Sequence, residues 1–451
     1  MNDDLKRAFT ALNGKLLPYN KLFSYADGNQ PIVYSTERLR EAFGNINAHF
    51  SQNWCSVVIN AALDRLTIKG FDAKNAVVNK TLDDLWARLN LGIDSYEAHK
   101  DSLITKEGYI IAWKDDDNGI SAYHNDPRMV HVFYKPEQPK EKQFAAKWWF
   151  DGAVWHMTLY YPDHLEYYVK RGETQPSAYS AFQPAKVPTA PNPFGVIPVF
   201  HFRGVGELEN IVTLQDAVNK LFADMMVAAE YGAFKQRWII AHDDTSALKN
   251  APNEIWEIPA GDGTGQDASV GQFDATPLDN YLKAINEIAN SIAIISRTPK
   301  HYFYSAGGQL SGEALLAMEA PLTKKVDTYQ ERFTPVWREL GAFLVKLSGS
   351  GDIDPNEITV TWKPSESIQP YTEAQTRQLA VASGIPLVTQ LKRNEGWTES
   401  EIKAMQKDAA DEKKANAALA PILLDEARAK TASDNSNPLD NPGDNQNGLS
   451  E

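Results

Sequence analysis

Two long helical patterns, separated by a short polar stretch, constrain this chain more than any other feature of its sequence. The first runs over residues 278–295, where apolar residues recur at the i, i+3, i+4 and i+7 spacing of an amphipathic helix. The second runs over residues 311–349 and, if helical throughout, would be about 58 Å long. Thr298-Pro299 is expected to end the first helix, because proline disfavours the α conformation in the residue before it. The fold must therefore accommodate one element longer than a small domain is wide.

The polar stretch between these patterns is rich in small residues. Gly307 and Gly308 lower the cost of reshaping the backbone, because glycine adopts conformations closed to other residues. After the stretch, Ser311 is expected to cap the second helix, whereas Pro321 and Pro335 are expected to kink or break it. Taken alone, the stretch would be an ordinary connection between two helices.

Composition and length indicate an ordinary globular chain. With 451 residues, 43% of them hydrophobic and 23% charged, the chain can form two or three domains with their own cores. No apolar run approaches the ~20 residues that span a bilayer, so no membrane partner is expected. The acidic and polar start, residues 1–6, is unlike a signal peptide and predicts a protein made and assembled in the cytoplasm.

Charge and cysteine content exclude further classes of protein. The formal net charge of −14 argues against a protein made to grip nucleic acid, which would present a basic face. It is compatible with a protein past which nucleic acid must slide. Cys55 is the only cysteine, which excludes an internal disulfide and a multi-thiolate metal site. Its apolar neighbours predict a buried thiol.

The first part of the chain is predicted to be mixed and then helical. Residues 1–45 are polar, with one short helix expected at residues 35–43. Apolar spacing predicts helices over residues 46–66, 81–91 and 95–107, with Thr81 as the N-cap of the second of these.

Residues 108–202 are predicted to form one antiparallel β meander. Short β-branched and aromatic runs alternate there with turn clusters. The strands are expected at residues 109–113, 129–134, 144–150, 154–161, 165–169 and 196–202.

The second half of the chain returns to helix. A helix over residues 207–232 precedes a small insertion with predicted strands at residues 237–240 and 254–258. After the long helical pattern, a strand is expected at residues 357–362 and short helices at residues 372–383, 386–393 and 398–411. Beyond Leu424 the chain loses its apolar residues and is predicted to be disordered.

The sequence motifs point away from catalysis. The glycine-rich run at residues 261–265 lacks the Gly-Lys-Ser/Thr ending of a phosphate-binding loop, and residues 115–119 lack the glutamate that completes a calcium loop. The histidines lack the helical spacing of a zinc site, and no Gly-x-Ser-x-Gly turn marks a nucleophile. We therefore predict no enzyme activity, no catalytic or metal site and no cofactor.

Four stretches share their order and spacing with a known family. They are Asn-Trp-Cys-Ser-Val-Val-Ile-Asn at residues 53–60 with Gly70-Phe71 after it, Asn-Pro-Phe-Gly-Val-Ile-Pro-Val at residues 192–199, Leu-Gln-Asp-Ala-Val-Asn at residues 214–219, and Ser-Gly-Glu-Ala-Leu at residues 311–315 with Ala320-Pro321-Leu322 after it. Across roughly residues 45–400 the chain resembles the portal proteins of tailed bacteriophages, especially the subgroup common in phages of Gram-positive hosts.

The resemblance implies an α+β portal fold and a closed ring of subunits, usually twelve. In this fold a helix-rich and β-meander wing surrounds a two-helix stem, a small α/β clip projects between the stem helices, and a helical crown follows at the C-terminal end. On this sequence the wing would comprise residues 1–206 and 312–364, the stem helices residues 207–234 and 276–299, the clip residues 235–275, the tunnel loop residues 300–311, the crown residues 365–424 and a disordered tail residues 425–451.

The same resemblance implies a structural role at one vertex of the virion capsid, as the channel for genome packaging and ejection. The implied partners are other copies of the chain, double-stranded DNA passing without sequence specificity, the large terminase, a head-completion adaptor and the major capsid protein, with a scaffolding protein as a further candidate. The residues implied to face DNA are Lys300, His301, Tyr304, Ser305, Ala306, Gly307, Gly308, Gln309 and Leu310. The implied clip docking surface consists of Trp238, Trp256, Asp262, Gly263 and Thr264.

A different class of function is the alternative. Trp148-Trp149-Phe150 and Tyr160-Tyr161 could stack sugars, as in a β-rich virion or tail module that recognises glycans. This alternative explains residues 108–202, but it gives no role to the helix pair around residues 235–275.

Overall fold

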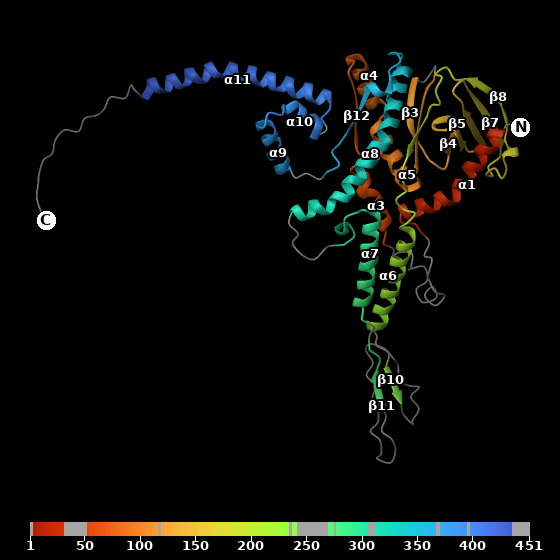
Figure 1. Cartoon of the computed structure of the whole chain (residues 1–451). Coiled ribbons are helices and arrows are strands. Elements are labelled where there is room, and N and C mark those ends of the chain that lie inside the picture. Colours follow the sequence, from red (N-terminus) through yellow and green to blue (C-terminus); the bar gives the residue numbers. More distant parts are fainter. Residues whose placement is uncertain are drawn as a thin grey trace, which may run out of the picture. The chain divides into compact units, whose positions relative to one another are not determined.

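The structure is a computed structural model that describes residues 3–30, 52–115, 119–233, 237–240, 269–274, 277–304, 312–366, 370–394 and 397–434. The chain divides into two compact units, Met1–Ala374 and Gln375–Glu451 (Figure 1). Helices and sheets both build the larger unit, so the predicted α+β class is confirmed for the described part of the chain.

The long helix α8 (Gly312–Ser348) runs unbroken for 37 residues through the larger unit. Of the two outcomes predicted for Pro321 and Pro335, a kink or a break, the break does not occur. One face of α8 is fully buried, through Leu322, Val326, Phe333, Trp337 and Leu340. This packing outweighs the local cost of proline in a helix, which is about 3 kcal/mol or more for each residue.

Three shorter helices pack around α8 and its neighbours. They are α3 (Trp54–Leu63), α4 (Ala76–Arg88) and α5 (Leu91–Thr105). The predicted N-cap at Thr81 is wrong, because Asn75 caps α4 by accepting hydrogen bonds from the backbone of Val77 and Val78. Thr81 lies inside the helix and donates back to the carbonyl of Val77. As predicted, Cys55 is buried, and burial raises the pKa of its thiol to about 12.

A two-stranded sheet joins the early and late parts of this unit. Strand β1 (Ile68–Ala73), which the sequence pattern does not predict, pairs antiparallel with β12 (Ile358–Trp362). The predicted strand at residues 357–362 is thus confirmed, and its partner lies almost 300 positions away in the sequence.

Residues 107–203 form two antiparallel sheets rather than the single predicted meander. The smaller sheet has the order β3-β2-β9 and the larger has the order β4-β5-β6-β7-β8. The strands are β2 (Glu107–Asp115), β3 (Gly119–Asn125), β4 (Val130–Lys135), β5 (Gln138–Phe150), β6 (Val154–Tyr160), β7 (His164–Arg171), β8 (Gln183–Pro191) and β9 (Val199–Arg203). Strands β3 and β8 are missing from the prediction, because neither carries the aromatic or β-branched run that marks the others.

The two sheets face each other, and a helix covers the outside of the larger one. Between the sheets lie the buried side chains of Tyr109, Ile111, Val130, Val132, Ala145, Ile197 and Val199. Helix α1 (Asp3–Ala26) packs on the other face of the larger sheet, where Phe9 meets Trp148 edge-on at 6.0 Å. The sequence pattern does not predict α1, and the short helix predicted at residues 35–43 lies outside the described residues.

The remaining elements lead away from this core and then into the C-terminal unit. In sequence order they are α6 (Val212–Ala233), β10 (Arg237–Ile240), β11 (Ser269–Gln272), α7 (Asp279–Ser296), α9 (Pro370–Ala382), α10 (Leu387–Asn394) and α11 (Glu399–Asp434), with short 3-10 turns at Tyr179–Ala181, Lys300–Tyr302 and Pro355–Glu357. Helix α11 continues to Asp434, so the predicted disorder from residue 425 is wrong for its first ten residues. Residues 435–451 lie outside the described part of the chain.

Candidate functional site

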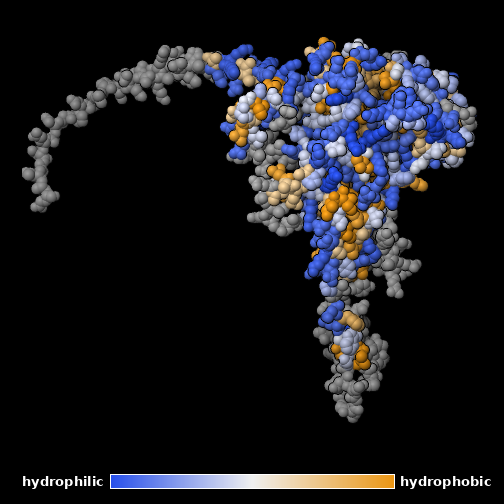
Figure 2. Space-filling view, in the orientation of Figure 1, coloured by the Kyte–Doolittle hydropathy of each residue, from blue (hydrophilic) through white to orange (hydrophobic). Residues whose placement is uncertain are grey.

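Helices α6 and α7 lie side by side and extend away from the sheets of their unit (Figure 1). They pack through buried positions that include Val218, Ile285, Ala289 and Ile292, as the apolar spacing predicts for residues 278–295. Figure 2 shows apolar side chains on the outer surface of the pair as well. Ile294, for example, is 77% exposed.

A buried ion pair connects the α6–α7 pair to α8 at the end where α6 begins and α7 ends, which we call the root of the pair. Lys325 Nζ lies 3.1 Å from Glu207 Oε2, just before α6, and donates to the carbonyl of Ser296, at the end of α7, over 2.7 Å. Tyr329 donates to the other oxygen of Glu207 over 2.7 Å. Burial lowers the pKa of Lys325, even though Glu207 opposes that shift. The start of α6, the end of α7 and the middle of α8 are therefore held together by one set of contacts.

The first turns of α6 also cap helix α3. Gln215, which is completely buried, accepts hydrogen bonds from the backbone N–H groups of Trp54 at 2.8 Å and Cys55 at 3.2 Å. Asn219 accepts the N–H of Gln52 at 3.0 Å. The Gln215 amide thus satisfies two of the donors that a helix leaves free at its N-terminus, and Asn219 holds the residue just before the N-cap. Two of the stretches that carry the family resemblance thus contact each other.

The residues predicted at the base of the tunnel loop are engaged with the protein. Lys300 begins a 3-10 turn, Lys300–Tyr302, and its ammonium lies 5.0 Å from the ring centre of Tyr304. The Tyr304 hydroxyl donates to Asn290 of α7 over 3.1 Å. Phe303 packs edge-on against Trp54 at 5.6 Å. Ser305, Ala306, Gly307, Gly308, Gln309 and Leu310 lie outside the described residues, as does the predicted N-cap Ser311.

One carboxylate gathers three side chains at this base. Glu319 of α8 forms an ion pair with Arg65, which follows α3, and its Oε1 lies 3.0 Å from His301 Nε2. Tyr302 accepts from Arg65 at 3.0 Å and its hydroxyl lies 3.4 Å from Glu319. Arg65 and Glu319 are only 11% and 12% exposed. We call Arg65, His301, Tyr302 and Glu319 the Glu319 clasp.

The predicted clip contains a small two-stranded ribbon, in which β10 pairs antiparallel with β11. The prediction of a strand at residues 237–240 is confirmed. The indole of Trp238 covers its cross-strand partner Gly271, where a Cβ would lie 2.4 Å from the ring. Ile240, Val270 and Phe273 are exposed. The strand predicted at residues 254–258 and the docking residues Trp256, Asp262, Gly263 and Thr264 lie outside the described residues.

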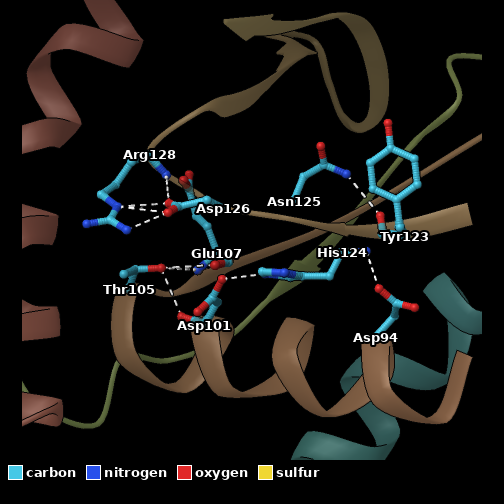
Figure 3. A network of polar contacts seen from close by, with 9 residues as sticks. All are labelled: Asp94, Asp101, Thr105, Glu107, Tyr123, His124, Asn125, Asp126 and Arg128. Carbon is cyan, nitrogen blue, oxygen red and sulfur yellow. Dashed lines mark hydrogen bonds and ion pairs between the residues drawn. The ribbon is translucent and has the colours of Figure 1, made fainter. Parts of the chain in front are cut away.

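Figure 3 shows a network of polar contacts around α5 and the neighbouring strands. His124 Nε2 lies 2.6 Å from Asp101, and Asp94 accepts the backbone N–H of His124 at 2.6 Å. Burial lowers the pKa of His124, but Asp101 outweighs it and the net shift is upward. Burial likewise raises the pKa of Asp101. The two contacts of His124 join α5 to β3, and Thr105 of α5 donates to the carbonyl of Glu107 in β2, so these contacts hold the helix on the smaller sheet.

The described residues give no sign of a metal centre or a membrane-spanning helix. No group of three or more His, Cys, Asp or Glu side chains among them could hold a metal ion. None of the described helices is both long and apolar enough to cross a bilayer. The aromatic run that suggested glycan binding belongs partly to the core, since Trp148 is 2% exposed.

The contacts that sequence reasoning missed include those of Arg65, Glu207, Glu319 and Lys325. One signal could have found two of them. Glu319 and Lys325 fall within the apolar stripe of α8, next to the buried residues Leu322 and Val326. A charged residue on a buried face implies a partner, because an unpaired buried charge is very costly. The sequence does not show which residue that partner is.

Comparison with known proteins supports one family. Residues 19–415 match the family described as phage portal protein, SPP1 Gp6-like. The chain is 23% identical over 430 residues to the portal protein of Mycobacterium phage D29, covering 85% of this chain and 86% of that protein. It is 22% identical over 366 residues to the portal protein of Mycobacterium phage L5, covering 72% of each chain.

A solved structure also aligns with the chain. It is described as the neck of an empty GTA particle computed with C6 symmetry, with a TM-score of 0.42 and 14% identity over 77% of this chain and 88% of that one. The family match covers most of the chain and includes the helix pair, its root and the Glu319 clasp. The chain belongs to the SPP1 Gp6-like family of phage portal proteins.

Proposed function

We propose that copies of this chain assemble into a closed ring, with twelve as the expected number, at one vertex of a phage capsid. The ring would be the channel through which the genome is packaged and later ejected. The observation that carries this proposal is the family match over residues 19–415. The α6–α7 pair, leading to the small β10–β11 ribbon, supports it as a stem that ends in a clip. Apolar side chains left uncovered on the pair, such as Ile294, would be covered by neighbouring copies.

Double-stranded DNA would pass through the ring without sequence-specific contacts. Each copy carries a formal charge of −14, so the assembled wall would repel phosphates instead of holding them. We propose that residues 305–310 face this DNA, with Lys300, His301 and Tyr304 at their base. Of these three, His301 is tied to Glu319, which makes it an anchor of the base.

The clip would dock the large terminase during packaging and a head-completion adaptor afterwards. An isolated two-stranded sheet is marginal in water, and this one exposes Ile240, Val270 and Phe273. A partner that covers these side chains would stabilise it. The wing would meet the major capsid protein, and a scaffolding protein during assembly in the host cytoplasm. ATP hydrolysis would belong to the terminase, and the ring itself would be structural.

The decisive experiment is to image the purified chain by negative-stain electron microscopy and to weigh it by native mass spectrometry. We expect closed rings with a central hole and a mass that is a whole multiple of 50.3 kDa. A species that stays monomeric under every assembly condition would contradict the proposal. Binding to a glycan array without ring formation would favour the glycan-binding alternative.

A further inference from the structure

Arg65 contacts two separate segments of the larger unit, the Lys300–Tyr302 turn and the segment around Ser365, which are called the first and the second exit below. Its Nη2 atom contacts the first exit. There it pairs with Glu319 and donates to the hydroxyl of Tyr302, a residue that precedes residues 305–311 in the sequence. Its Nη1 atom serves the second exit, where it lies 3.3 Å from the carbonyl of Ser365. The chain continues from Ser365 toward α9 and the C-terminal unit.

A single edge of α8 receives both sets of contacts. Glu319, Thr323 and Asp327 follow each other at intervals of four residues, so they line one side of the helix. Glu319 holds the first exit, Thr323 Oγ1 lies 3.4 Å from Arg65 Nη1, and Asp327 accepts from the Ser365 hydroxyl at 2.6 Å. Ser365 itself is 8% exposed. The same edge of α8 therefore holds both exits, and Arg65 contacts both of them.

The shape of the guanidinium makes these contacts interdependent. Its donors are fixed in one plane, so the two ends of the fork cannot move separately. A shift of the Lys300–Tyr302 turn relative to α8 must either break the contacts of Nη2 or turn the whole group and disturb Nη1. Because Arg65 and Glu319 are largely buried, water replaces lost contacts poorly, and an intermediate arrangement is unfavourable.

We propose that Arg65 and Glu319 are positioning residues that couple the base of the loop to the lead into the C-terminal unit. Displacement of the Lys300–Tyr302 turn would loosen Ser365, and displacement at Ser365 would loosen the turn. In the proposed portal, on which this inference rests, the coupling would link the channel-facing segment to the crown. The coupling itself is a property of one chain and can be measured without a channel.

The test uses hydrogen exchange on the full-length protein with three variants. The reporter amides of the first exit are those of Tyr302 and Phe303, which donate to Pro299 and Lys300. The reporter of the second exit is the amide of Lys363, which donates to Thr67. Arg65→Gln should speed exchange at both exits by about tenfold or more. Arg65→Lys keeps the charge near Glu319 but loses the fork, so it should speed exchange mainly at the second exit.

Glutamine has nearly the same shape as the native glutamate, so Glu319→Gln tests the coupling separately from a change in side-chain shape. It removes the charge that faces the first exit, and we expect faster exchange at Lys363 as well as at Tyr302. The matched control is Glu331→Gln, an exposed residue on the same helix, which should exchange like the unmodified protein. If Glu319→Gln loosens only Tyr302 and Phe303 while Lys363 is unchanged, the coupling does not exist.

DNA retention in assembled particles gives the second readout. We expect Glu319→Gln to form rings normally but to lower the yield of DNA-filled particles by about tenfold, with Glu331→Gln unaffected. Normal yield despite altered exchange would overturn the link to DNA passage. Absence of rings from the unmodified chain would overturn the proposed function, while the exchange results would still decide the coupling.

Discussion

His99 illustrates how single buried polar residues are accommodated in this protein. Its ring is completely buried, with Nδ1 3.2 Å from the carbonyl of Leu66 and Nε2 accepting from Trp337 at 3.0 Å. The proton must therefore lie on Nδ1, and the ring is neutral. Burial lowers the pKa of His99 to about 3. Stacking on Phe333, at 4.8 Å, holds the ring in this orientation.

This environment makes a prediction about pH. The pKa of His99 is lower in the folded than in the unfolded protein, so the unfolded chain takes up a proton as pH falls below about 6.5, whereas the folded chain does so only near 3. Stability from this group is complete above pH 6.5 and declines as the pH falls toward 3. At pH 6.5 we expect the free energy of unfolding of His99→Gln, measured by thermal unfolding, to be about 1–3 kcal/mol lower than that of the unmodified protein. Between pH 6.5 and 4 it should then decline less steeply. Parallel curves for the two proteins would contradict this account.

Gln215 has the corresponding role between two helices. Helix α3 has Asn53 as its own cap, which accepts only the N–H of Ser56. Gln215 of α6 supplies the acceptor for the N–H groups of Trp54 and Cys55. The orientation of α3 relative to the helix pair is therefore set by hydrogen bonds as well as by apolar contact.

Replacing Gln215 should separate the contribution of these hydrogen bonds from that of apolar contact. Gln215→Ala leaves two buried N–H groups without an acceptor, so we expect a loss of about 1–3 kcal/mol in the free energy of unfolding. Urea denaturation followed by circular dichroism would measure it. Thr213→Ala, an exposed change in the first turn of the same helix, is the matched control and should cost less than about 0.5 kcal/mol. Equal effects of the two changes would show that the cap contributes little.

The β10–β11 ribbon depends on one glycine. Adding a methyl group at Gly271 would place it 2.4 Å from the indole of Trp238, so the ring must leave its position over β11. We expect Gly271→Ala to red-shift and weaken the Trp238 fluorescence and, if the clip docks the terminase as proposed, to reduce that binding by about tenfold or more. Ser269→Ala, on the same face of the same strand, is the control. Unchanged terminase binding would remove this ribbon from the docking surface.

At the scale of the whole molecule, net charge should affect the proposed ring assembly. Copies that each carry −14 repel one another, and the repulsion is screened when salt shortens the Debye length. Raising the salt concentration from about 20 mM to about 200 mM should therefore increase the fraction of chains found in rings. Mass photometry at fixed protein concentration would measure this fraction. Rings that dissociate as salt is added would instead indicate that ion pairs between copies hold the assembly together.

The sequence alone predicted the features that depend on neighbouring residues. The helix over residues 278–295, the apolar pattern of α8 and most strands of residues 107–203 follow from apolar periodicity, which is a property of a few consecutive turns or residue pairs. Helix α1 escaped this reasoning, although Leu5, Ala8, Phe9 and Leu12 share one face. Whether these residues are buried depends on the larger sheet that they cover, which is formed by a distant part of the sequence.

Only the tertiary structure decided which distant residues meet. Arg65 and Glu319 are 254 positions apart, and Gln215 caps a helix that begins 161 positions before it. The same holds for the pairing of β1 with β12 and for the division of the predicted meander into two sheets. Periodicity reports that a side chain will be buried, but a buried charge or amide is stable only when a specific partner reaches it. That partner is selected by the packing of whole elements, which local sequence does not encode.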